Sequence, residues 1–159
     1  MEAYYVIRDA DLLHGPQPNI TIMPPHKIGQ EFPKTFGHYH NHGETETYRI
    51  LYGEASLLIQ RPAVNSNTPD ESNYDQIEEV KLLHAKVGET LKVPAGFGHC
   101  LINLSQDLLV TADWESDNAG HIYEPIQKLR GFCYYIVEEN GEPKAIKNPS
   151  YRLIPSLSL

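Results

Sequence analysis

Residues 37–53 read GHYHNHGETETYRILYG and gather histidines, acidic residues and glycines in one short stretch. In an extended strand, residues i and i+2 point to the same face, so His38 and His40 project side by side, with backbones ~7 Å apart. Two imidazoles in this arrangement can share one metal ion. Glu44 and Glu46 have the same parity, but a turn before them would aim only one of them inward. The segment alone leaves both glutamates open as a third ligand.

A second stretch, GETLKVPAGFGHCLIN at residues 88–103, carries a histidine shortly after a Pro-x-Gly turn. It resembles the second motif of the cupin superfamily, which reads Gly, five residues, Pro-x-Gly, two residues, His, three residues, Asn. The residues that fill this motif are Gly88, Pro94, Gly96, His99 and Asn103. The resemblance implies that His99 joins the first two histidines at a metal site.

The opening stretch is similar to the first cupin motif, which reads His-x-His, a short spacer, Glu, six residues, Gly. This motif selects Glu46, because six residues separate it from Gly53, whereas Glu44 would leave eight. The spacer between His40 and Glu46 has five residues rather than the usual three or four. Glu44 therefore remains the alternative ligand.

Three imidazoles and one carboxylate suit a divalent first-row metal and leave positions for oxygen ligands from a substrate. We expect one ion per chain, with Fe²⁺ placed first and Mn²⁺, Ni²⁺ or Zn²⁺ as alternatives. The expected ligands are His38, His40, Glu46 and His99. The histidines outside both motifs are expected at the surface or in loops; they are His14, His26, His42 and His84.

Short runs of β-branched and aromatic residues alternate with turn residues along the chain, which is typical of an all-β sandwich or barrel. With the two motifs, they predict a single cupin domain over residues 1–159, a double-stranded β-helix or jelly-roll barrel. One short helix is expected near 124–130, with Pro125 at its start and Gly131 at its end. The polar stretch 61–76 is interpreted as a long surface loop. The expected strands are 4–7, 19–23, 47–53, 55–60, 79–87, 89–94, 99–104, 108–114, 132–139 and 143–148.

Composition narrows the class of protein further. The chain has 159 residues, 40% of them hydrophobic, which suffices for the core of one ordinary domain. Its net charge of −8 has no basic cluster to offset it, which argues against nucleic acid as a partner. The N-terminal segment lacks the apolar run of a signal peptide, and no segment reaches membrane-spanning length, so we expect a cytoplasmic protein without a membrane partner. Cys100 and Cys133 are too few for a disulfide framework and are expected as small apolar strand residues.

The segments around the two motifs narrow the resemblance. TFGHYH at 35–40 and ETYRILYG at 46–53 look like the Thr-x-Gly-His-x-His and Glu-x-Tyr signature of the cupin-type phosphoglucose isomerases. The stretch from GHIYEP to NPSY at 120–151 resembles that family's His-x-Tyr pair, short helix and hairpin. The resemblance implies a homodimeric isomerase that interconverts glucose 6-phosphate and fructose 6-phosphate, a step of glycolysis and gluconeogenesis.

The resemblance also implies roles for single residues. Thr35 and Gly37 fall on the phosphate-binding part of the signature, and Thr21 falls on a further threonine that contacts phosphate. The residues that fall on positions at the sugar are Tyr48, His121 and Tyr123. A hydroxyl and backbone N–H groups can hold a phosphate without any arginine, which suits an acidic protein.

Two reaction routes fit such a site. In one, Glu46 takes a proton from C2 and returns it to C1 through a cis-enediol, while Tyr48 or His121 moves the hydroxyl protons. In the other, a hydride passes directly between the two carbons. A glutamate that ligates a metal is a weakened base, which is an argument against the first route, but the sequence does not decide between them.

Three other functions fit part of the pattern. A different sugar-phosphate isomerase or epimerase would use the same residues on another substrate. A cupin oxygenase would use the same three-histidine, one-glutamate iron site to activate dioxygen, but would have no need of Thr35, Gly37 or the His121–Tyr123 pair. A metabolite-binding cupin would bind tightly without turnover.

Overall fold

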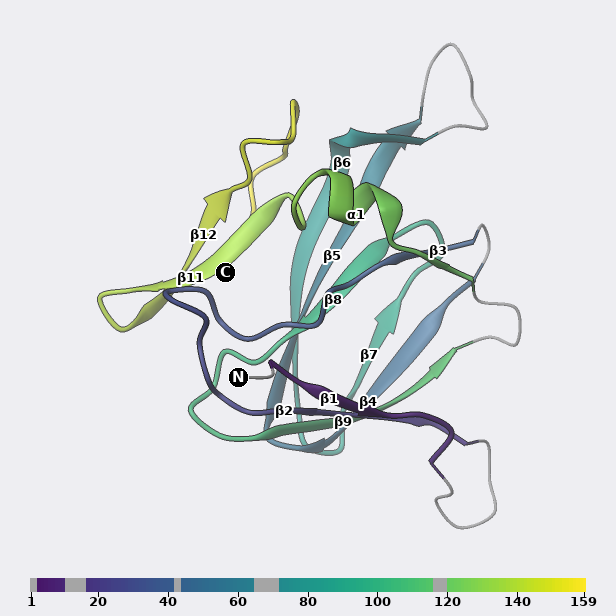
Figure 1. The fold of residues 1–159 in the computed structure, drawn as a ribbon, viewed down its shortest axis with the longest axis vertical. Helices are drawn as coiled ribbons and strands as arrows, with labels where there is room; N and C mark the ends of the chain where they lie inside the picture. The colour runs from purple at the N-terminus through teal and green to yellow at the C-terminus, as the bar shows by residue number, and fades with distance from the viewer. Residues whose placement is uncertain (1–2, 11–16, 42–43, 65–71, 116–119) are drawn as a thin grey trace.

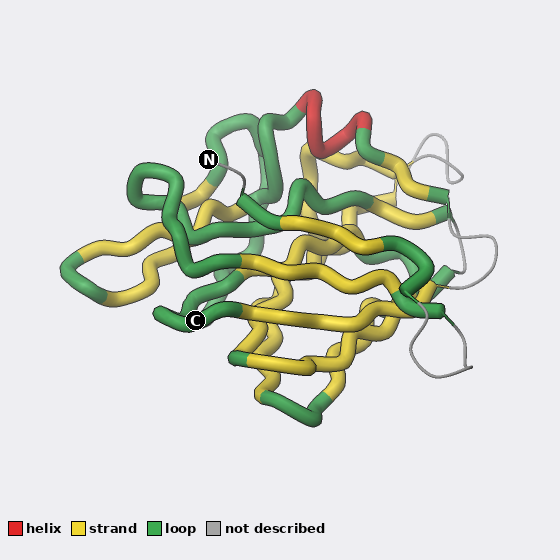
Figure 2. The backbone as a smooth tube through the Cα atoms, turned by 60° about the horizontal axis from the view of Figure 1, so that its bottom comes forward, coloured by secondary structure: helices red, strands yellow, loops and turns green. Residues whose placement is uncertain are grey.

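The computed structural model describes residues 3–10, 17–41, 44–64, 72–115 and 120–159. Within these ranges the regular structure is antiparallel strand, apart from one short helix, α1 (Glu124–Lys128), drawn in red at the edge of Figure 2. The strands, labelled in Figure 1, are β1 (Tyr5–Ile7), β2 (Asn19–Met23), β3 (Tyr39–His40), β4 (Glu46–Tyr52), β5 (Glu54–Val64), β6 (Ser72–Lys86), β7 (Thr90–Val93), β8 (Gly98–Ile102), β9 (Leu109–Glu115), β10 (His121–Ile122), β11 (Tyr134–Glu139) and β12 (Glu142–Lys147).

The strands form two main sheets. The first has the order β1-β2-β9-β4-β7, and the second has the order β6-β5-β8. In Figure 1, β1, β2 and β9 lie along the bottom of the molecule, while β5, β6 and β8 rise through its centre. The hairpin of β11 and β12 and the helix α1 lie on the other side of the second sheet, away from the first.

The second sheet continues through the histidine segment. His38 and His99 form an antiparallel bridge beside β8, with backbone hydrogen bonds of 3.2 and 3.0 Å. Next to this bridge, β3 pairs with β10, with His40 opposite His121. The order β6-β5-β8-β3-β10 thus gives a second set of five strands facing the first, so the expected all-β cupin barrel is confirmed.

Apolar side chains fill the space between the two sheets and the space behind the second one. Leu57 and Ile59 of β5 point into the inner cluster, which also contains Tyr48 and Leu91 of the first sheet. Leu58 points the other way, into an outer cluster formed with the C-terminal hairpin and helix. Both faces of β5 are therefore buried, which explains why its sequence is a continuous apolar run rather than an alternating one.

Most expected elements are present, and one expectation is wrong. The helix begins at Glu124 with Pro125 in its first turn, as predicted. The stretch 61–76 is not one long loop, because β5 continues to Val64 and β6 begins at Ser72. The pairing shifts register on both sides of Pro62, since a proline has no N–H to donate and fits a sheet at such an irregularity.

Two further expectations concern the cysteines and the membrane. Cys100 lies in β8 and Cys133 lies just before β11, and both are free and buried. The described part of the chain contains no helix with the length and apolar character needed to cross a membrane.

Candidate metal and substrate site

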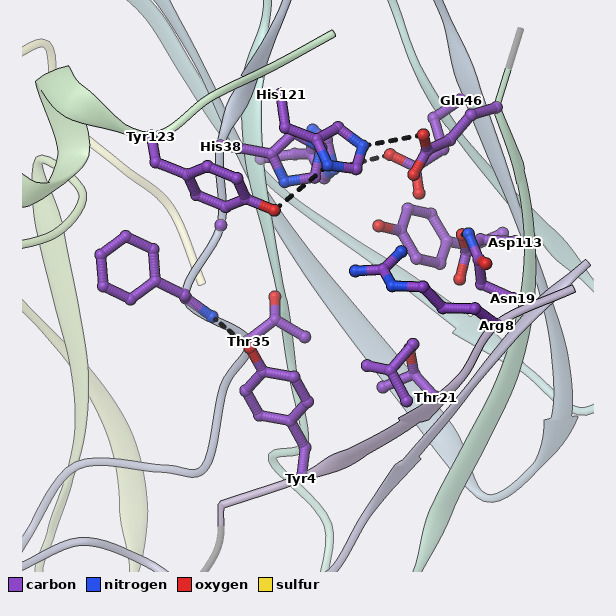
Figure 3. A pocket seen from close by; sticks show the side chains of 16 residues that line it. Tyr4, Arg8, Asn19, Thr21, Thr35, His38, Glu46, Asp113, His121 and Tyr123 are labelled. Carbon is purple, nitrogen blue, oxygen red and sulfur yellow. Dashed lines mark hydrogen bonds and ion pairs between the residues drawn. The ribbon is translucent and has the colours of Figure 1, made fainter. Parts of the chain in front are cut away.

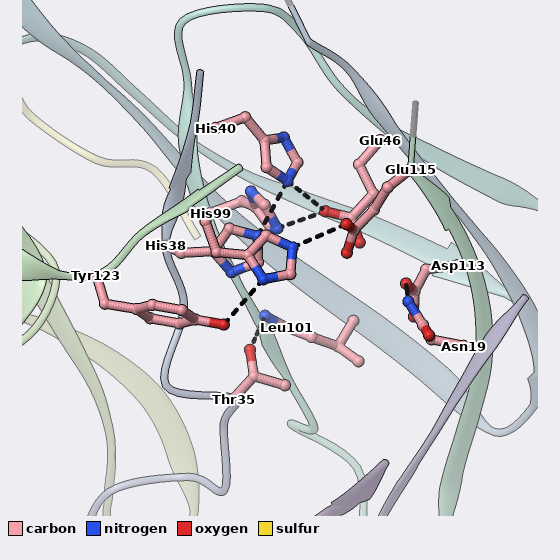
Figure 4. Close-up of polar contacts among 11 residues, drawn as sticks. Asn19, Thr35, His38, His40, Glu46, His99, Leu101, Asp113, Glu115 and Tyr123 are labelled. Atoms are coloured by element: carbon pink, nitrogen blue, oxygen red, sulfur yellow. Dashed lines mark hydrogen bonds and ion pairs between the residues drawn. The ribbon is translucent and has the colours of Figure 1, made fainter. Parts of the chain in front are cut away.

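Four side chains from both sheets meet at one point inside the barrel. The Nε2 atoms of His38 and His40 are 3.0 Å apart. Glu46 Oε2 lies 3.4 Å from His40 Nε2 and 2.7 Å from His99 Nε2. Figure 4 shows the three rings and the carboxylate turned toward one another. These are the four predicted ligands, and the structure brings Glu46, not Glu44, into this cluster.

Two glycines allow the histidine segment to lie this close to β8. Gly37 has φ +77°, and a Cβ there would lie only 2.6 Å from the carbonyl oxygen of His99. A Cβ on Gly98 would lie 2.6 Å from the ring of Tyr39. Any side chain at either position would push the two segments apart, and the His38–His99 bridge would be lost.

The cluster fits a divalent metal because its side chains are buried and some of their polar atoms lack hydrogen bonds. The side chains of His40, Glu46 and His99 are only 1 to 2% exposed. Glu46 Oε2 and His99 Nε2 approach closely, yet neither makes a hydrogen bond within the described chain. Ligand atoms ~2.1 Å from an ion and at right angles to each other would be ~3.0 Å apart, close to the observed separations. Buried polar atoms without hydrogen bonds that face one point indicate a cation site.

The lowered pKa values of the three histidines are also consistent with a metal site. Burial, reinforced by the neighbouring histidines, lowers the pKa of His38 to about 2. Burial also lowers the pKa of His40 and that of His99 to about 4. All three imidazoles are therefore neutral at pH 7, which is the form that ligates a metal.

Glu46 belongs to a second network on its other side. Tyr48 and Asp113 both hydrogen-bond to it, and Asn19 Nδ2 donates to Asp113 Oδ2 at 3.0 Å. Burial raises the pKa of Glu46 to about 7 and that of Asp113 to about 7. The hydrogen bond raises the pKa of Asp113 and lowers that of Glu46, so Asp113 is the member that keeps the proton and donates it.

His121 and Tyr123 lie beside the cluster rather than far from it. The ring of His121 is 4.1 Å from that of His38, centroid to centroid. Its Nε2 lies 2.8 Å from Glu115 Oε2, and its Nδ1 lies 3.2 Å from the hydroxyl of Tyr123. The expected loop before the helix contains the short strand β10, which pairs with β3. This pairing explains why His121 is held next to the ligand segment.

Hydroxyl groups line the wall of the pocket below these rings, as Figure 3 shows. Thr35 Oγ accepts a hydrogen bond from Leu101 N at 3.0 Å, which leaves its own proton free to donate. Tyr4 accepts a hydrogen bond from Phe36 N at 3.3 Å and keeps its proton free in the same way. Thr21 is 4% exposed and lines the same pocket.

One pocket is lined by all of these groups except His40. Its empty volume, including space open to solvent, is about 480 Å³, within the range of roughly 300–1,000 Å³ typical of small-molecule sites. Phe36 and Tyr123 form an edge-to-face pair at its rim, with ring centroids 5.9 Å apart, and both are well exposed. The pocket is therefore polar inside and aromatic at its mouth.

Sequence reasoning missed five polar residues that line the pocket, besides the apolar Val6 and Phe36. The polar ones are Tyr4, Arg8, Asn19, Asp113 and Glu115. All five come from β1, β2 and β9 or from residues next to them, which the sheet register aligns with β4: Glu46 lies opposite Glu115, and Tyr48 opposite Asp113. A signal was present in β9, where the polar residues Thr111, Asp113 and Glu115 recur at every second position.

The remaining histidines do not join the cluster. His26 is exposed, and the exposed His84 contacts Ser56 Oγ through Nδ1 at 2.9 Å, outside the pocket. His14 and His42 lie outside the described residues.

Comparison with known proteins gives consistent sequence matches. Residues 4–152 match the family described as Glucose-6-phosphate isomerase (GPI). The glucose-6-phosphate isomerase of Pyrococcus abyssi (strain GE5 / Orsay) is 31% identical over 133 residues, or 83% of this chain and 62% of that protein. That of Thermococcus litoralis is 30% identical over 134 residues, or 84% of this chain and 63% of that protein. The chain spans less than two thirds of the length of these relatives.

Among solved structures, oxalate oxidase in complex with the substrate analogue glycolate has a TM-score of 0.52. It is 18% identical, and the match covers 78% of this chain and 56% of that one. At this identity the likeness concerns the fold alone.

Proposed function

Because the chain belongs to the glucose-6-phosphate isomerase family, we propose that it interconverts glucose 6-phosphate and fructose 6-phosphate. The observation that carries the proposal is the composition of the pocket. One end holds three imidazoles and a carboxylate with converging atoms, and the wall below them holds hydroxyl groups suited to a phosphate. A metal-assisted aldose–ketose isomerisation of a phosphorylated sugar would use both.

The metal of the proposal is held by His38, His40, Glu46 and His99, with Fe²⁺ first and Mn²⁺, Ni²⁺ or Zn²⁺ as alternatives. When bound, such an ion supplies a Lewis acid for the oxygens on C1 and C2, where negative charge develops. The low pKa of the histidines keeps them available as neutral ligands at physiological pH.

The substrate's phosphate is assigned to the hydroxyl wall. Thr35 donates its free hydroxyl proton, because its oxygen already accepts from Leu101 N. The N–H of Gly37 makes no hydrogen bond within the described chain and is a second donor. Thr21, on β2, supplies a further hydroxyl. Backbone and hydroxyl donors of this kind are common partners of phosphate oxygens.

Proton transfer is assigned to the groups above the sugar. In the cis-enediol route, Glu46 moves a proton between C2 and C1, and the hydrogen bonds from Tyr48 and Asp113 hold its carboxylate in place. Tyr123 hydrogen-bonds a sugar hydroxyl, and His121 relays a proton during ring opening or between O1 and O2. In the hydride route the same residues only orient the two carbons. We also propose that the protein is a cytoplasmic homodimer, as the sequence resemblance implies.

A coupled assay tests this function. Purified protein is incubated with fructose 6-phosphate, and the glucose 6-phosphate formed is oxidised by its dehydrogenase, which reports NADPH. We expect turnover that EDTA abolishes. Formation of mannose 6-phosphate instead would indicate a different aldose–ketose isomerase, and formation of an epimeric ketose 6-phosphate would indicate an epimerase. Oxygen consumption without isomerisation would indicate an oxygenase, and tight binding without any product would indicate a binding protein.

A further inference from the structure

The pocket contains one strong cation among several carboxylates. Glu46, Asp113 and Glu115 line it, and Arg8 is its single lysine or arginine within the described chain. An anionic substrate that enters this pocket meets net negative charge unless a cation lies on its path. Arg8 therefore bears directly on how a phosphate could be bound here.

The fold brings Arg8 into the pocket through strand alternation. Tyr4, Val6 and Arg8 are spaced by two, and all three line the pocket, as expected for one face of an extended segment. β1 pairs with β2 in a register that places Val6 opposite Thr21. In Figure 3 the guanidinium of Arg8 extends from this edge strand into the pocket, above Thr21.

Arg8 also makes no hydrogen bond or ion pair with any other described residue. The guanidinium of Arg61 pairs with Glu78, and that of Arg152 pairs with Asp75. The exposed Arg49 and Arg130 have no ion pair among the described residues either, but neither of them lines the pocket. A guanidinium has five N–H donors in a planar fork, all of which are free at Arg8. A free fork in a pocket is a ready site for a phosphate, which it can bind through two oxygens at once.

The charge of Arg8 also reaches both ends of the pocket. Burial is the main cause that lowers the pKa of His38 and raises that of Tyr123, and the positive charge of Arg8 is a smaller cause that lowers both. In Figure 3 the guanidinium of Arg8 lies between Thr21 on one side and Glu46 and His121 on the other.

We propose that Arg8 is a specificity-determining residue that binds the phosphate of the substrate together with Thr21 and Thr35. The inference rests on the proposed function for the identity of the sugar. It replaces the expectation from sequence that hydroxyl and N–H groups bind the phosphate without an arginine. Hydroxyl donors alone distinguish poorly between a phosphate and a neutral hydroxymethyl group, whereas the charge of a guanidinium strongly favours the phosphate.

The test is calorimetric binding of glucitol 6-phosphate, which cannot isomerise, and of glucitol to metal-loaded protein. Arg8→Gln should weaken binding of glucitol 6-phosphate by about 10- to 100-fold, the range for a lost hydrogen bond to a charged group. Binding of glucitol should not change. The matched control is Arg49→Gln, because Arg49 is exposed on β4 and does not line the pocket. Arg8→Lys keeps the charge without the fork and should give intermediate affinity.

The outcomes separate the two proposals. Unchanged affinity for glucitol 6-phosphate in Arg8→Gln, or an equal loss for glucitol, overturns the role of Arg8. If Arg8→Gln does not fold, wild-type affinity in Arg8→Lys overturns the bidentate contact. If the wild type binds glucitol 6-phosphate in an Arg8-dependent way but does not turn over fructose 6-phosphate, the isomerase function fails and the role of Arg8 stands.

Discussion

Glu115 and His121 are joined through Oε2 and Nε2 at 2.8 Å, and this contact fixes which nitrogen of His121 carries the proton. With Nε2–H donated to the carboxylate, Nδ1 is the acceptor for the hydroxyl of Tyr123. Glu115→Gln removes the charge that orients the ring. We expect kcat to fall roughly 10-fold or more, with a smaller change in the binding of glucitol 6-phosphate.

A double-mutant cycle checks that Glu115 acts through His121. His121→Ala should lower kcat strongly while leaving folding and metal content intact, and adding Glu115→Gln to it should have little further effect. Glu142→Gln, on the hairpin strand β12, is the matched control. Fully additive losses in the double variant would mean that Glu115 has a separate role, and an unchanged kcat in His121→Ala would overturn the proton relay.

The second prediction concerns metal content. His99→Ala removes a ligand whose Nε2 lies 2.7 Å from Glu46 Oε2 at the centre of the cluster. Elemental analysis of the wild type should give one divalent ion per chain, and the variant should have lost it. His84→Ala is the control, since His84 lies outside the pocket. A wild-type metal level in His99→Ala would show that the ligand set is misassigned.

The two candidate glutamates are compared in the same experiment. Glu46→Gln should lose metal and activity, because Glu46 lies in the cluster. Glu44→Gln should be mild. The reverse order would mean that Glu44 is the ligand in the loaded protein.

The third prediction concerns Thr35. Thr35→Val removes a hydroxyl that we assign to the phosphate, so KM for fructose 6-phosphate should rise by the equivalent of roughly 1.5–3 kcal/mol. Thr35→Ser keeps the hydroxyl, including the oxygen that accepts from Leu101 N, and should behave like the wild type. Equal losses of Thr35→Val on phosphorylated and free sugar would make Thr35 part of the scaffold rather than of the phosphate site.

The fourth prediction follows from the buried carboxyl of Asp113. Burial, with a contribution from Glu46, raises its pKa from an ordinary value of 3.8 to about 7. A pKa that is raised on folding contributes stability that is fully present below the pKa of the unfolded state. This stability is lost as the pH rises through the folded-state pKa of about 7. Asp113→Asn resembles the protonated form. The free energy of unfolding of this variant, taken relative to that of the wild type, should therefore rise by on the order of 1–3 kcal/mol when the pH is raised from 5 to 8.

Urea unfolding of EDTA-treated protein at both pH values measures this difference. The matched control is Asp107→Asn, because Asp107 is exposed, and its difference from the wild type should be the same at both pH values. If Asp113→Asn also shows one constant difference, the carboxyl of Asp113 does not change its charge on folding in this pH range.

The bounds of single strands were predicted from the sequence better than the pairing between strands. Long β-branched runs such as that of β2 were found with the right bounds, because alternation and turn residues are local signals. Pro62 suggested a loop, although a register shift lets the strand pass through it. The two-residue strands β3 and β10 are too short to have a periodic pattern, so the pairing of His40 with His121 could not be foreseen.

In the candidate site, too, the residues of local motifs were predicted and the residues placed by strand pairing were not. The four residues of the candidate metal site follow from two motifs with characteristic spacing, because each motif fixes its histidines on one strand or turn. Arg8 and Glu115 reach the pocket only because β1 and β9 are aligned with β4 by the sheet register. Such alignment depends on pairing between segments distant in sequence, which a single sequence does not specify.

The most direct measurement of the central claim is a metal titration of isomerase activity. Protein stripped with EDTA is reloaded with Fe²⁺, Mn²⁺, Ni²⁺ or Zn²⁺ in steps, and the formation of glucose 6-phosphate from fructose 6-phosphate is measured beside bound metal. We predict no activity without metal, a rise proportional to occupancy with at least one of these ions, and a plateau at one ion per chain. Full activity in the stripped protein, or no activity at full occupancy with any of the four, would contradict a metal-dependent isomerase.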